Sequence, residues 1–154
     1  MSTITASQPD HAGLLGDVSR AGVYHLPFAL HDNYESLMAT AQDLGYAVFR
    51  VDLGQAENKQ DLLAAIGKAM GFPDWFGDNW DALADCLADL EWSPAEGYLI
   101  LLEHCDRLHA NAGADLVAAL QLFEAAADEW RERGIALWCL VDMQADGIAW
   151  LPGL

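Results

Sequence analysis

The chain has 154 residues, of which 53% are hydrophobic and 20% charged, so it is long enough to bury one core and too apolar to be disordered. Twenty-four acidic residues against seven basic ones give a formal net charge of −17, which repels nucleic acids and anionic lipids and attracts cationic partners. We therefore expect one globular domain that binds neither nucleic acid nor membrane directly.

Cysteine usage and apolar runs bear on the compartment. Each of the three cysteines, Cys86, Cys105 and Cys139, lies in an apolar stretch, and their spacing lacks the pairs of a zinc site. This pattern is typical of free, buried thiols in a reducing compartment. Residues 1–20 lack the basic start and apolar core of an export signal, and the apolar run 135–141 is too short to cross a bilayer. We expect a cytoplasmic protein.

The first third of the chain begins with a segment that lacks any sustained period. Residues 1–21 are polar and dotted with glycine, and we expect a flexible N-terminal tail. The stretch GVYHL at 22–26 predicts a short strand, and apolar residues at helical spacing within 32–44 predict a helix that Gly45 ends. The apolar, β-rich run 46–53 predicts a buried strand. This third of the chain therefore predicts a tail followed by a strand, a helix and a strand.

The remaining elements continue the alternation. Asn58 is a favourable cap for a helix that ends at Gly71. After it we expect a helix, a strand, a long helix and a last strand, at 79–90, 98–102, 114–133 and 135–141.

Strands that are apolar on both sides and alternate with helices predict an α/β fold with a parallel sheet. We expect a small sheet of three strands, with a fourth from the N-terminal extension, packed with helices. The domain is expected to span 22–143, including the N-terminal strand and helix, and to be followed by a C-terminal tail at 144–154.

The helix expected at 79–90 has one apolar and one acidic side. The apolar side is predicted to face the body and consists of Trp80, Leu83, Leu87 and Leu90. Asp81, Asp85 and Asp89 follow one another at four-residue steps on the other side, and we call these three residues the acidic stripe. Like charges at this spacing destabilise a helix by roughly 0.2–0.5 kcal/mol per pair. The acidic stripe is therefore either an ordinary solvated face or a surface kept for a basic partner.

Two features beside the acidic stripe favour a partner. Ala84 and Ala88 are small and leave the carboxylates open to the arginines or lysines of another protein. Trp75 and Phe76 lie with Gly77 in the loop before the helix, where no periodic pattern calls for large rings. These rings either plug the core beneath the loop or anchor a partner.

The sequence FPDWFGDNWDALADCL, from Phe72 to Leu87, resembles the signature of the barstar family, the intracellular inhibitors of barnase-type ribonucleases. The order of the expected strands and helices extends the resemblance to about 47–141. The resemblance implies a barstar-like fold in which the loop and the helix block the active site of a basic ribonuclease. It also implies that acidic side chains occupy positions meant for RNA phosphates.

The resemblance assigns roles to residues by their position in the signature. The binding loop is implied to contain Trp75, Phe76, Gly77 and Asn79. Asp81 and Asp85 are implied to be acidic contacts, and Asp85 is the expected dominant anchor. Ala84 and Ala88 lie on the same face.

Four positions extend or depart from the family pattern. Asp89 adds charge close to the acidic contacts. Glu129 is carried over as a contact from the last helix when that helix is aligned on Gly134, whereas alignment on Phe123 does not select it. Ala84 and Leu90 stand where the family prototype has aromatic residues, which points to a different target.

The leading hypothesis is a non-enzymatic inhibitor or immunity factor that binds a basic ribonuclease or a related basic toxin and needs no cofactor. One alternative is a metal-assisted hydrolase in which Asp78, Asp81 and Asp85 hold a divalent cation. Another is a barstar-fold binding module for a basic protein that is not a nuclease. The stretch EHCDRLH at 103–109 could suggest a metal site or a Cys–His nucleophile, but its spacing fits a strand-end loop with Cys105 packed inward better.

Overall fold

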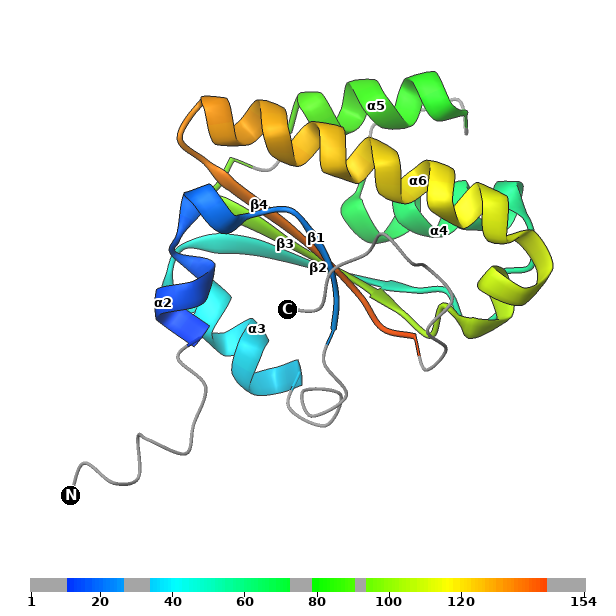
Figure 1. Cartoon of the computed structure of the whole chain (residues 1–154), viewed down its shortest axis with the longest axis horizontal. Coiled ribbons are helices and arrows are strands. Elements are labelled where there is room, and N and C mark those ends of the chain that lie inside the picture. Colours follow the sequence, from blue (N-terminus) through cyan, green and yellow to red (C-terminus); the bar gives the residue numbers. More distant parts are fainter. Residues whose placement is uncertain (1–10, 27–33, 73–78, 91–93, 144–154) are drawn as a thin grey trace.

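The computed structural model describes residues 11–26, 34–72, 79–90 and 94–143, and the tail predicted at 144–154 lies outside them (Figure 1). The described elements follow the chain as α2 (His11–Leu15), η1 (Val18–Arg20), β1 (Val23–His25), α3 (Tyr34–Asp43), β2 (Tyr46–Asp52), α4 (Lys59–Met70), α5 (Trp80–Ala88), β3 (Gly97–Glu103), α6 (Asp106–Glu132) and β4 (Ala136–Val141). No helix in these ranges is long and apolar enough to span a bilayer.

The strands form one parallel sheet in the order β1-β4-β3-β2, which confirms the predicted α/β fold and the fourth strand from the N-terminal extension. The chain steps from β2 to β3 to β4 in one direction and from β1 to β2 in the other. Right-handed crossovers therefore place α4, α5 and α6 on one face of the sheet and α3 on the opposite face. Figure 1 shows these two helical layers on either side of the strands.

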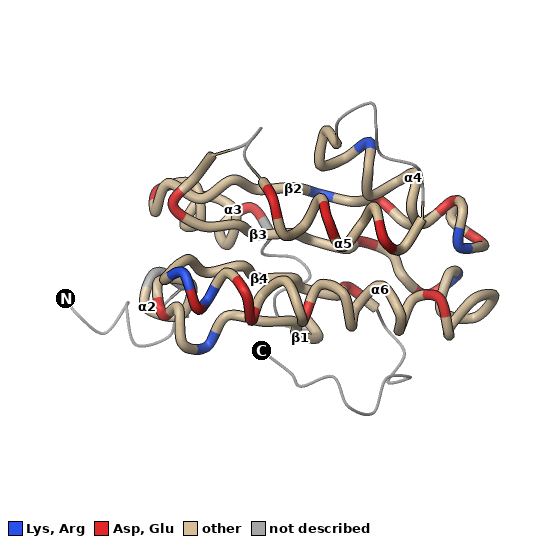
Figure 2. Tube along the Cα trace, turned by 90° about the horizontal axis from the view of Figure 1, so that it is seen from above, with Lys and Arg blue, Asp and Glu red and all other residues tan. Residues whose placement is uncertain are grey.

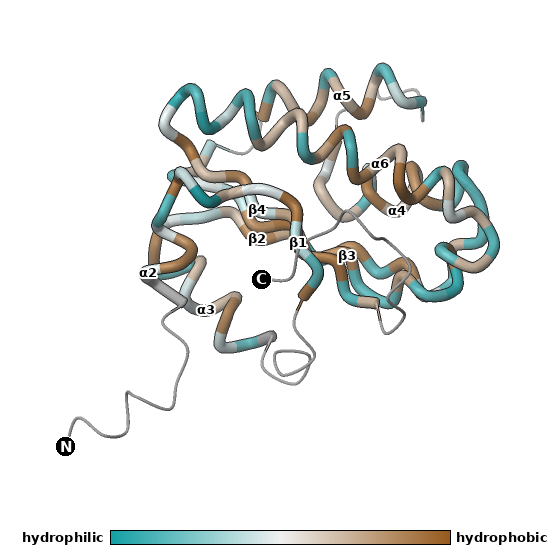
Figure 3. Tube along the Cα trace, viewed as in Figure 1, coloured by the Kyte–Doolittle hydropathy of each residue, from teal (hydrophilic) through white to brown (hydrophobic). Residues whose placement is uncertain are grey.

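The larger core lies between the sheet and the layer of α4, α5 and α6. Fully buried residues from each helix meet there, including Ile66, Leu87 and Phe123. Hydrophobic and hydrophilic residues alternate along α6, as expected of an amphipathic helix (Figure 3). The predicted caps of α4 are also present: the Asn58 side chain accepts a hydrogen bond from the Asp61 amide, and Gly71 ends the helix in the left-handed conformation.

The long helix begins earlier than predicted. A loop was expected up to residue 113, but α6 begins at Asp106 and passes through a kink at Ala112, whose φ of −147° and ψ of 52° are not helical. The kink interrupts the helical period that marks the rest of α6, so the first turns were not recognised. They are held to the core by Leu108, which is fully buried.

Part of the predicted N-terminal tail is folded onto the sheet. Residues 11–20 contain α2 and η1, and Leu15 is fully buried. The Leu15 carbonyl accepts hydrogen bonds from the Tyr46 hydroxyl at 2.6 Å and from Trp138 Nε1 at 3.1 Å. A five-residue helix carries too short a pattern to be recognised, and its stability comes from these tertiary contacts.

The N-terminal elements close a second core on the opposite face of the sheet. The strand residues that point into it include four apolar side chains that are fully or almost fully buried, Leu99, Leu101, Trp138 and Leu140. Leu15 from α2 and Leu37 from α3 cover them. Without α2 and α3 this face of the sheet would be a large exposed apolar surface.

Replacing Leu15 with alanine tests this cover. Because Leu15 is fully buried, we expect Leu15→Ala to lower the free energy of unfolding by about 2–5 kcal/mol, measured by urea denaturation. The matched control is Leu14→Ala in the same helix, where the side chain is only half-buried and the loss should stay below about 1.5 kcal/mol. Equal, small losses from both variants would show that α2 does not stabilise the fold.

Candidate functional site

The helix α5 begins at an N-cap that the sequence supplies. The Asn79 side chain accepts a hydrogen bond from the Ala82 amide at 2.8 Å. Asp81 lies in the first turn, where the positive end of the helix dipole favours a carboxylate. Asn79, assigned by resemblance to a binding loop, therefore also fixes the start of the helix that follows the loop.

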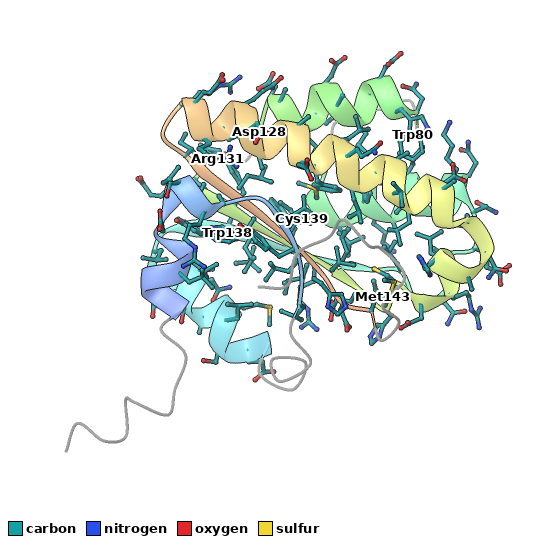
Figure 4. All side chains as sticks on the ribbon, viewed as in Figure 1. Trp80, Asp128, Arg131, Trp138, Cys139 and Met143 are labelled. Carbon is teal, nitrogen blue, oxygen red and sulfur yellow. The ribbon has the colours of Figure 1, made fainter. Side chains whose placement is uncertain are left out.

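The inner face of α5 is packed into the larger core. Leu83 and Leu87 are fully buried, as the spacing predicted. Trp80 is half-buried at the start of the helix and lies with its ring centroid 4.9 Å from Lys59 Nζ of α4 (Figure 4). Cys86 is fully buried, and the pKa of its thiol is raised to about 11 by burial and then by the carboxylates of Asp85 and Asp89. Cys86 is therefore a packing residue.

The acidic stripe lies on the outer face of α5. Asp81, Asp85 and Asp89 are exposed, and Ala84 and Ala88 between them are half-buried. The ion pairs seen among the described residues are formed by other side chains, and the carboxylates of Asp81 and Asp85 face solvent. Figure 2 shows acidic residues recurring along α5, which carries no lysine or arginine.

The C-terminal end of α5 is bound by Trp130 of α6 and by Arg133, the residue that caps the end of α6. Trp130 Nε1 donates a hydrogen bond to the Leu87 carbonyl at 2.7 Å, and Arg133 Nη1 donates one to the Ala88 carbonyl at 3.2 Å. The Arg133 guanidinium lies 4.6 Å from the centroid of the Trp130 ring. These contacts were not predicted from the sequence. Their only trace in the sequence is the three-residue spacing of Trp130 and Arg133 just before Gly134.

The remaining predicted site residues fall in two groups. Glu129 is exposed on α6, next to Trp130, which contacts α5. It therefore belongs to the same end of the helical layer as the last turn of α5. Trp75, Phe76 and Gly77 lie outside the described residues, as does Asp78.

The residues of EHCDRLH do not form a reactive site. Cys105 is fully buried and its Sγ donates to the Leu102 carbonyl at 3.3 Å, as expected of an inward-packed thiol. Burial, followed by the carboxylates of Asp142, Asp106 and Glu103, holds the pKa of the Cys105 thiol far above its usual range, so the thiol is neutral. Within the described part of the chain no three His, Cys, Asp or Glu side chains are grouped to hold a metal ion.

Comparisons with known proteins identify a family and a fold neighbour. Among solved structures, a chain of the Aeropyrum pernix ORC2 protein in its ADPNP-ADP complexes aligns with a TM-score of 0.54 at 18% identity. The alignment covers 86% of this chain but only 39% of that chain, so it establishes likeness of fold alone. No curated protein sequence matches significantly.

The model of the family described as Barstar (barnase inhibitor) matches residues 46–142. This match begins at β2, includes α5 and reaches the end of β4, and it leaves out α2, β1 and α3. Because it covers well over half of the sequence, the chain belongs to the Barstar (barnase inhibitor) family.

Proposed function

We propose that the chain is a non-enzymatic inhibitor that binds a basic ribonuclease of the barnase type, or a related basic toxin, and blocks its active site with α5 and the loop before it. The observation that carries this proposal is the acidic stripe. Its carboxylates are exposed on a helix whose inner face is fixed in the core. Membership of the barnase-inhibitor family supports the same reading.

The geometry of α5 suits recognition of a phosphate-binding cleft. Asp81 and Asp85 are four residues apart, so their side chains project from the same side of the helix about one turn apart. Each carboxylate offers two oxygens that can accept paired hydrogen bonds from arginine. The small side chains of Ala84 and Ala88 lie beside them and allow a partner surface to approach closely. Carboxylates held in this way imitate successive phosphates of RNA.

The charge of the whole molecule favours fast capture of such a partner. A net charge of −17 attracts a basic protein over several ångströms and repels RNA, so the protein would find the nuclease rather than its substrate. The interaction needs no cofactor. The cysteines Cys86, Cys105 and Cys139 are all free and buried, which is consistent with action in the reducing cytoplasm.

The two alternatives make different predictions. A binding module for another basic protein would use the same acidic stripe, so only identification of the partner separates it from an inhibitor. A pull-down from the source cells, followed by ribonuclease assays on the basic proteins recovered, makes that distinction. A metal-assisted hydrolase would bind divalent ions by itself, and calorimetric titration of the isolated chain with Mg²⁺, Mn²⁺ and Ca²⁺ would detect them.

Inhibition of barnase tests the proposal with a defined enzyme. We expect the wild-type chain to inhibit RNA cleavage by barnase, and Asp85→Ala to weaken binding by about ten- to one-hundred-fold, because hydrogen bonds to charged groups are lost. Asp89→Ala is the matched control at the helix end and should weaken binding less than about three-fold. Both aspartates are exposed, so neither variant should change the melting temperature appreciably. Equal, small effects from the two variants would contradict a role for Asp85.

The salt dependence of the binding rates tests electrostatic steering separately. Raising the NaCl concentration from 50 mM to 500 mM shortens the Debye length from roughly 14 Å to about 4 Å. We expect the association rate with barnase, measured by stopped-flow fluorescence, to fall several-fold while the dissociation rate changes little. An association rate that does not respond to salt would remove steering from the proposal.

A further inference from the structure

The two neighbouring helices α4 and α5 end in different ways. After α4, Gly71 adopts a φ of 67° and its amide donates to the Gly67 carbonyl, which is a self-contained C-cap. After α5, Asp89 is extended, with a φ of −129°. Its amide donates to the Asp85 carbonyl, so the next carbonyls of the last turn need donors from elsewhere.

Those donors come from the last turn of α6 and from the residue that caps its C-terminal end. Trp130 Nε1 reaches the Leu87 carbonyl at 2.7 Å in a buried hydrogen bond, and Arg133 Nη1 reaches the Ala88 carbonyl at 3.2 Å near the surface. The two donors therefore satisfy consecutive carbonyls at the end of α5. We call Trp130 and Arg133 the trans cap.

The trans cap is itself rigidly held. The Trp130 side chain is almost fully buried, and its ring centroid lies 5.3 Å from that of Tyr98 on β3. The Arg133 guanidinium lies over the Trp130 ring, with its central carbon 4.6 Å from the ring centroid. The end of α5 is therefore tied through one tryptophan to both α6 and the sheet.

The last turn of α5 has a particular need for such support. The helix has nine residues, which is too few for stability without tertiary contacts. Asp85 and Asp89 repel each other, and Asp89 also lies at the negative end of the helix dipole. The guanidinium of Arg133 places a positive charge at the same end and counteracts both effects.

We propose that Trp130 and Arg133 are positioning residues that fix the acidic stripe, and Asp85 in particular, in the orientation needed to bind a basic partner. The expected effect on partner binding rests on the proposed inhibitor function. The cap itself can be tested without a partner. A surface held in its bound geometry loses less conformational entropy on association and releases its partner more slowly.

The test compares Arg133→Met with Arg107→Met. Both variants remove one arginine and change the net charge equally, but Arg133 caps the C-terminal end of α6, whereas Arg107 lies in its first turn and pairs with Glu57. Methionine keeps an apolar stem against Trp130 while removing the donors. Trp130→Phe is a second variant that keeps an aromatic ring and removes the buried N–H.

Amide hydrogen exchange of the full chain is the first measurement. In Arg133→Met and Trp130→Phe, we expect the amides of Ala88 and Asp89 to exchange about three- to ten-fold faster than in wild type, because a capping hydrogen bond is lost. Exchange of the Leu101 amide on β3 should stay unchanged in Arg133→Met, and Arg107→Met should leave α5 unchanged. Unchanged exchange at Ala88 and Asp89 in both cap variants, or equal acceleration at Leu101, would overturn the trans cap.

Binding to barnase is the second measurement. We expect Arg133→Met to raise the dissociation rate about three- to ten-fold over Arg107→Met, while the association rates of these equally charged variants stay the same. Faster exchange in α5 with an unchanged dissociation rate would overturn the positioning role. If wild type does not bind barnase at all, the proposed function fails for this enzyme, and the exchange data still decide whether the trans cap exists.

Discussion

The strands β3 and β4 are buried along their whole length, and all residues of β4 are apolar, so both faces of the sheet must be covered. This need determines where the helices lie. The layer of α4, α5 and α6 covers one face, and α2 and α3 cover the other. The family match at 46–142 includes the first layer and leaves out α2 and α3, whose apolar residues cover the second face here. These N-terminal elements close the second core, and α5 lies on the other side of the sheet from them.

The position of α5 follows from the same burial. Because Leu83 and Leu87 are fixed in the core, the period of the helix directs Asp81 and Asp85 toward solvent. The arrangement costs stability through repulsion between carboxylates, and contacts at the two ends of α5 offset that cost. Asn79 caps the beginning, and the trans cap binds the end. A short helix with an unfavourable charge pattern is thereby held in one geometry.

Much of this fold could be predicted from the sequence, because the relevant signals are local. Apolar runs marked the strands, and Asn58 and Gly71 marked the ends of α4. The inner and outer faces of α5 followed from residue spacing alone. The missed features depend on contacts between distant residues: the bonds of the trans cap join positions 43 and 45 residues apart, and α2 is held by Tyr46 and Trp138. No local pattern encodes such partners.

Ala84 and Leu90 both depart from the family pattern, and the structure places them in different surroundings. Leu90 is 1% exposed and belongs to the larger core, so its side chain packs inside this protein and does not face a partner. Ala84 is half-buried on α5 between Asp81 and Asp85, at the surface that the proposed partner would contact. A large aromatic ring there would fill space that a partner side chain can enter here. Under the proposed function, it is therefore Ala84 that gives this chain a preference for a different target. Asp81 and Asp85 keep the role of acidic contacts.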